Sequence, residues 1–195
     1  MFFTILFIAH IQSVLIPIIL ALKSINNFKH LVNYPCIPLG FLSIGLASIF
    51  ETIDHTFTDW IYINHTTKWN WLFYAFLSLG LILLAISITR KKRIIFINSF
   101  LYLGVISSYW IYGKPASIFF QGLISLYLII NWSKKFKDWL IFAYPIFGIL
   151  LTTSFGSSLS LTSNQIWHIF IGPSGSISVL IFYFVLKRSN INQKK

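Results

Sequence analysis

Seven long apolar segments divide this 195-residue chain, and they constrain its fold more than any other feature. Each segment is close to the roughly 20 residues that an α-helix needs to cross the hydrocarbon core of a bilayer. The segments lie at about 2–22, 37–57, 70–89, 94–112, 115–132, 138–156 and 165–186. Pro145 and Pro173 interrupt the last two, but membrane helices tolerate proline. The pattern predicts an all-α, polytopic integral membrane protein with seven transmembrane helices.

The composition excludes several other classes of protein. Hydrophobic residues make up 56% of the chain and charged residues only 10%, whereas soluble domains carry about 25% charged residues. An ordinary soluble globule, a disordered chain and a nucleic-acid binder are therefore excluded. The single cysteine, Cys36, excludes an internal disulfide and a cysteine-rich metal cluster.

The basic residues follow alternate segments, and this alternation predicts the topology. All but Lys68 and Lys114 follow the first, third, fifth or seventh segment. Because basic residues favour cytoplasmic loops, we expect the N-terminus outside and the C-terminus in the cytoplasm. The short connections predict one transmembrane domain, residues 1–188, followed by a basic tail, 189–195. Membrane lipid is the predicted partner, while the host membrane and the oligomeric state are not indicated.

Three of the four acidic residues lie within nine positions near the outer end of the second segment. Helical spacing places Glu51 on one face with Ser48, His55 and Asp59, and directs Asp54 elsewhere. An ionisable group inside a membrane span is costly and therefore indicates a functional site. Asp54, His55 and Asp59 could instead form an exposed helix end. The fourth acid, Asp138, is expected only to mark the start of a helix.

Two further histidines reach the same depth as Glu51. His10 lies inside the first segment and His168 near the outer end of the seventh, so both are predicted in the outer half of the bilayer. Histidine nitrogens and a carboxylate suit Zn²⁺, and a metal-bound water is a nucleophile at neutral pH. Interhelical hydrogen bonding is an alternative explanation of these residues.

The seventh segment also resembles the last helix of the CREST superfamily, which contains the alkaline ceramidases and the adiponectin-receptor/hemolysin III proteins. That helix carries a His-x-x-x-His motif, and here the second histidine matches His168 while Asn164 replaces the first. The family's second helix has a serine four residues before a histidine. Here Ser48 is followed by Glu51 at a spacing of three. The family also has a characteristic aspartate, and the residues next to Asp54 resemble those around it. Asp59 is the alternative match.

The resemblance implies a metal-dependent intramembrane hydrolase that cleaves an amide or ester bond in a lipid substrate. Glu51, His55 and His168 would bind the metal, with His10 as a geometric substitute. Asp54 or Asp59 would act as acid or base, and Ser48 would assist. Two rival interpretations remain open at this stage. One is a small-solute or proton-coupled transporter that uses Glu51 as its titrating group, and the other is a structural subunit of a membrane complex.

Overall fold

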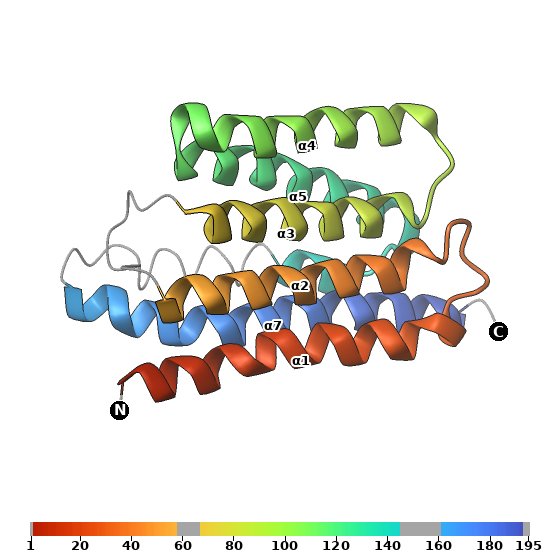
Figure 1. The fold of residues 1–195 in the computed structure, drawn as a ribbon. Coiled ribbons are helices and arrows are strands. Elements are labelled where there is room, and N and C mark those ends of the chain that lie inside the picture. Colours follow the sequence, from red (N-terminus) through yellow and green to blue (C-terminus); the bar gives the residue numbers. More distant parts are fainter. Residues whose placement is uncertain (1, 58–66, 145–160, 193–195) are drawn as a thin grey trace.

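The fold is that of a computed structural model, which describes residues 2–57, 67–144 and 161–192. The described chain is almost entirely helical (Figure 1). The helices are α1 (Phe2–Asn27), α2 (Cys36–Phe57), α3 (Lys68–Ile86), α4 (Lys92–Tyr112), α5 (Lys114–Phe136), the short 3₁₀ helix η1 (Trp139–Phe142) and α7 (Leu161–Asn192). The predicted all-α architecture is therefore confirmed for these residues.

The first five predicted segments and the seventh each correspond to a long helix. The sixth, predicted at 138–156, is described only at its beginning, where Asp138 starts η1 by accepting a hydrogen bond from the Leu140 N–H (3.0 Å). Asp138 thus marks a helix start, as predicted. Residues 145–160 lie outside the described residues. Helix α7 continues to Asn192 and so includes the first residues of the predicted tail.

Four of the described helices are long and apolar enough to cross a membrane, namely residues Cys36–Asp54 of α2 and the whole of α3, α4 and α5. Helix α4 is an example of a surface suited to lipid, because its outward face exposes large apolar side chains such as Phe96, Phe100 and Leu103. Exposed apolar faces of this extent would aggregate in water. They support the conclusion that the protein is a multi-pass integral membrane protein.

The helices run roughly parallel or antiparallel to one another (Figure 1). Helix α1 packs against α2 and α7, while α3 packs against α2, α4 and α5. Where α2 meets α3, a Cβ atom built on Gly80 would lie 2.8 Å from the Gly40 carbonyl oxygen and 2.6 Å from the Ile44 side chain. A glycine is therefore needed for this close approach of two helices.

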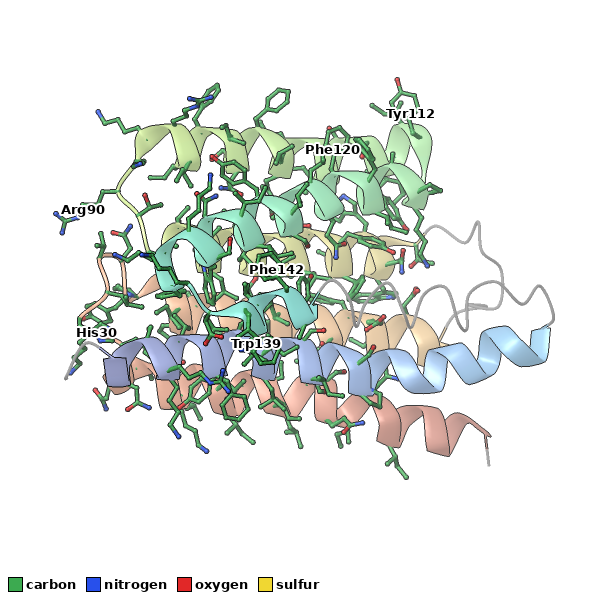
Figure 2. The ribbon with its side chains drawn as sticks, turned by 180° about the vertical axis from the view of Figure 1, so that it is seen from behind. His30, Arg90, Tyr112, Phe120, Trp139 and Phe142 are labelled. Carbon is green, nitrogen blue, oxygen red and sulfur yellow. The ribbon has the colours of Figure 1, made fainter. Side chains whose placement is uncertain are left out.

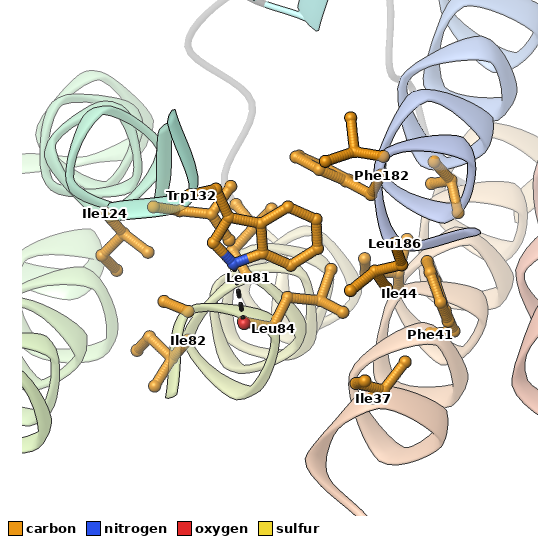
Figure 3. Packing of buried hydrophobic residues seen from close by; sticks show 14 of the residues in the cluster. Ile37, Phe41, Ile44, Leu81, Ile82, Leu84, Ile124, Trp132, Phe182 and Leu186 are labelled. Atoms are coloured by element: carbon orange, nitrogen blue, oxygen red, sulfur yellow. Dashed lines mark hydrogen bonds between the residues drawn. The ribbon is translucent and has the colours of Figure 1, made fainter. Parts of the chain in front are cut away.

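A buried tryptophan connects three helices in the core (Figure 3). The Trp132 indole of α5 donates a hydrogen bond to the Leu84 carbonyl oxygen of α3 (3.0 Å). Its ring also lies edge-on to Phe182 of α7, with 5.5 Å between the ring centroids. The indole thus satisfies its one donor while its apolar surface fills the space between α3, α5 and α7.

The two ends of the bundle differ in chemistry. His30 and Arg90 lie at one end, and Tyr112 lies at the other (Figure 2). The predicted basic loops at 23–29, 90–93 and 134–137 all belong to the end of Arg90, which we call the basic end. Asp54 and Thr67 contact each other beside Tyr109, near the end of Tyr112, which we call the polar end. The start of α1 and the end of α7 lie at opposite ends (Figure 1).

A buried polar site at one end of the helix bundle

Glu51 lies in the interior of the protein near the polar end. The residue is only 8% exposed, and the residues of α2 that precede it are mostly apolar. Among the described residues, the ionisable groups that act on it electrostatically are His10 of α1, Lys114 of α5 and Asp54 of α2. Among the residues that the structure describes, none donates a hydrogen bond to its carboxylate. We call Glu51 and these three neighbours, together with Tyr74, the polar site.

His10 is almost completely buried, with 1% of its surface exposed. The sequence placed it at the depth of Glu51 on a different helix, and the structure brings the two within electrostatic range. The backbone carbonyl of His10 accepts a hydrogen bond from the Ser13 hydroxyl (2.6 Å) within α1. That His10 and Glu51 bind a metal ion together stays a prediction.

Asp54 is also 1% exposed, so the alternative interpretation as part of an exposed helix end is wrong for this residue. It acts electrostatically on Glu51, so the prediction that it is directed elsewhere is also wrong, because residues three apart are neighbours on a helix surface. Its Oδ1 accepts a hydrogen bond from the Thr67 hydroxyl. The same hydroxyl oxygen accepts a hydrogen bond from the Asn70 N–H (3.0 Å) and thereby caps the start of α3. Asp54 therefore connects α2 to the start of α3, while its role as an acid or base stays a prediction.

Tyr109 of α4 completes this connection. Its buried hydroxyl accepts a hydrogen bond from the Thr67 N–H (3.0 Å) and lies 3.2 Å from Asn70 Oδ1, to which it can donate. The Tyr109 ring also packs against that of Tyr74, with 6.2 Å between the centroids. Side chains and backbone groups of α2, α3 and α4 are thus joined by one hydrogen-bond network at the polar end.

Lys114 brings a cation to the same region. Gly113, with φ +78° and ψ −174°, makes the one-residue connection between α4 and α5, in a backbone conformation that is essentially restricted to glycine. This tight connection places Lys114 at the first turn of α5, where Glu51 and Asp54 both act on it. Two carboxylates and one ammonium group therefore lie within electrostatic range of one another in the polar site.

The structure describes the other predicted site residues only in part. Ser48 lies on α2 one turn before Thr52, is buried, and donates to the Ile44 carbonyl oxygen (3.3 Å). His55 belongs to α2, and His168 and Asn164 belong to α7, but their side chains lie outside the described residues. Asp59 lies outside them altogether. Within the described part of the chain, no group of three or more histidine, cysteine or acidic residues could hold a metal ion.

Sequence reasoning missed Thr67, Asn70, Tyr74, Tyr109 and Lys114. Thr67 precedes a long apolar segment, which is a known signal for a helix cap, and Lys114 is one of two basic residues outside the alternating pattern. Both signals were present in the sequence. Nothing in the local pattern distinguishes Tyr74 or Tyr109 from the many other aromatic residues of the chain.

Comparison with known proteins identifies the class of the protein. A family model described as "Seven transmembrane receptor" matches residues 1–192. The chain therefore belongs to this family of seven-transmembrane receptors, which agrees with the seven apolar segments of the sequence. The match does not identify the CREST superfamily in particular. No curated protein and no solved structure matches the chain.

Proposed function

We propose that the protein acts as a membrane receptor and that the polar site binds its ligand. The observation that supports this proposal is the buried Glu51 carboxylate, which receives no hydrogen bond from the described residues. Burying a carboxylate is unfavourable unless donors or opposite charges compensate it, and such residues inside membrane spans usually have a functional role. A ligand that supplies a donor to Glu51 would recover part of this cost.

The chemistry of the site favours a small ligand with a cationic group. When the His10 imidazole is neutral, Glu51 and Asp54 together outnumber the one ammonium group of Lys114. The neighbouring ring of Tyr74 is buried against that of Tyr109, and aromatic faces attract cations that have lost their water. An organic ammonium group would pair with Glu51 and lie beside these rings.

Thermal unfolding of the purified protein in detergent tests the proposal. Ethanolamine and choline are the cationic probes, and acetate is the anionic comparison. We expect the cations to raise the melting temperature of the wild type and of Asp138→Asn, which removes an acid at the basic end, but not that of Glu51→Gln. Equal effects of the cations on wild type and Glu51→Gln, or no effect on either, would refute the proposal.

A metal-dependent lipid hydrolase is a second candidate, favoured by the proximity of His10 to Glu51. These two residues supply one nitrogen and one carboxylate, but catalytic zinc sites usually have three protein ligands. His55 or His168 would have to supply the third. Bound zinc would activate a water molecule. Ser48 would bind the lipid carbonyl group, and Asp54 would accept or donate the proton.

Elemental analysis separates the two candidates. The hydrolase requires about one zinc per wild-type chain and its loss in Glu51→Gln and His10→Ala. A metal-free wild-type protein that still responds to the cationic probes would exclude the hydrolase and support the receptor.

A further inference from the structure

A second polar surface lies at the basic end, where α5, η1 and α7 meet. Two adjoining hollows of about 290 and 350 Å³ share Lys137, Asp138 and Trp139 as lining residues. Arg188 of α7 lines the first hollow, and Lys134 of α5 lines the second. We call the surface formed by these five residues the basic groove. It carries three cations and one acid, at the opposite end of the bundle from the polar site.

The acid of the basic groove is already engaged. Asp138 Oδ1 accepts the hydrogen bond from the Leu140 N–H (3.0 Å) and lies 3.5 Å from Arg188 Nη1. Its side chain is 12% exposed, compared with 53% for that of Arg188. Asp138 therefore orients the guanidinium, which has further N–H donors to offer to another partner.

Lys137 has an unusual backbone conformation for its residue type. With φ +51° and ψ +30°, it is the one non-glycine residue of the described chain that has a positive φ. Glycine or asparagine is usual at this position after a helix, because a Cβ atom is disfavoured there. The conformation ends α5, and it places a lysine at the boundary of both hollows.

Apolar side chains border these cations. Trp139 is 73% exposed and Phe142, which lines the second hollow, is 48% exposed. Both belong to η1 and are labelled in Figure 2. Exposed aromatic residues beside lysine and arginine are typical of the level of the lipid headgroups in a membrane. The groove therefore combines a cationic part with an apolar border, as an amphipathic ligand requires.

We propose that the basic groove binds an anionic phospholipid of the surrounding membrane. The lipid phosphate would accept hydrogen bonds from Lys137 and Arg188, and Lys134 would add a third positive charge. The acyl chains would lie along Trp139 and Phe142. Basic pockets between membrane helices are known to hold anionic headgroups in this way, and charge-assisted hydrogen bonds to phosphate are strong.

Native mass spectrometry of the full chain in detergent tests this proposal. Phosphatidylglycerol is the anionic probe, and phosphatidylcholine with the same acyl chains is the neutral comparison. Lys137→Gly removes the cation and introduces the residue best suited to φ +51°, so it preserves the fold. Arg188→Gln removes the second cation. Lys135→Gln is the matched control, because Lys135 is exposed near the end of α5 but lines neither hollow.

We expect the wild type to retain phosphatidylglycerol in preference to phosphatidylcholine. Lys137→Gly and Arg188→Gln should each weaken this binding about fivefold, and Lys135→Gln should leave it unchanged. Equal retention of both lipids by the wild type would overturn the proposal. So would unchanged phosphatidylglycerol binding in Lys137→Gly and Arg188→Gln, or an equal loss in Lys135→Gln.

Discussion

The hydroxyl of Tyr109 gives the sharpest test of how the polar end is built. Substitution by phenylalanine keeps the ring, its packing on Tyr74 and the apolar surface, and removes one oxygen atom. That oxygen is the acceptor for the Thr67 N–H (3.0 Å) and lies within hydrogen-bond distance of Asn70 Oδ1 (3.2 Å). Both Tyr109 and Asn70 are buried while Thr67 is half-buried, so water can replace the lost partner only in part.

The magnitude follows from leaving polar groups unpaired. A buried donor or acceptor that loses its partner costs about 1–3 kcal/mol. We take about 2 kcal/mol for Tyr109→Phe, because the Asn70 side chain has freedom to find another donor. For a domain of 150–250 residues, a loss of about 1 kcal/mol lowers the melting temperature by roughly 2–4 °C. We therefore expect Tyr109→Phe to melt about 4–8 °C below the wild type.

Tyr112→Phe is the matched control for this measurement. Tyr112 lies on the same helix, three residues further along, but it is 76% exposed. The same chemical change should therefore shift the melting temperature there by less than about 1 °C, since surface substitutions rarely exceed 0.5 kcal/mol. Thermal unfolding in one detergent at one protein concentration compares the variants. Equal shifts for Tyr109→Phe and Tyr112→Phe would refute the reasoning.

Three further substitutions test the packing that holds the polar site in place, by the same unfolding measurement. Trp132→Phe should destabilise the protein by about 1–3 kcal/mol, because it leaves a void in the core and removes one of two hydrogen bonds to the Leu84 carbonyl oxygen, which keeps the one from the Ser87 hydroxyl (2.7 Å); exposed Trp139→Phe should not. Gly80→Ala should cost about 1–3 kcal/mol by overpacking the α2–α3 contact, whereas Gly122→Ala, with open space around it, should be neutral or stabilising. Gly113→Ala should cost about 1–3 kcal/mol, since its φ of +78° suits glycine alone. A stable Gly80→Ala protein would mean that α2 and α3 are further apart than described.

The positions of the helices could be predicted because the bilayer sets their length. The predicted segment 37–57 and the observed α2, Cys36–Phe57, differ by one residue. The third helix shows where this reasoning stops. It was predicted to end at residue 89, but α3 ends at Ile86, and the Asn33 side chain donates to the carbonyl oxygens of Ile86 and Thr89 at this end (2.9 and 2.6 Å). A partner more than fifty residues away cannot be read from a hydrophobic pattern.

The candidate site likewise contains some residues that could be predicted from the sequence and others that could not. Glu51 could be found because a carboxylate within an apolar segment is conspicuous, and the depth of His10 followed from counting residues along a helix. The burial of Asp54 could not be predicted, since it depends on Thr67 approaching from another helix. Tyr109 also contacts Thr67 across the bundle. A sequence reveals which polar residues are out of place in a membrane, but their partners depend on how the helices pack.

These non-local contacts also bear on how a ligand would meet Glu51. Helix α3 is held at the polar end by Asp54 and Tyr109 through Thr67, and at the basic end by Asn33. A shift of α3 toward Glu51 would break hydrogen bonds at both ends, at about 1 kcal/mol or more for each bond. Helix α3 therefore cannot easily move to supply a donor to the carboxylate. A ligand that pairs with Glu51 would find α3 already in position, so that little of its binding energy is lost in ordering this helix.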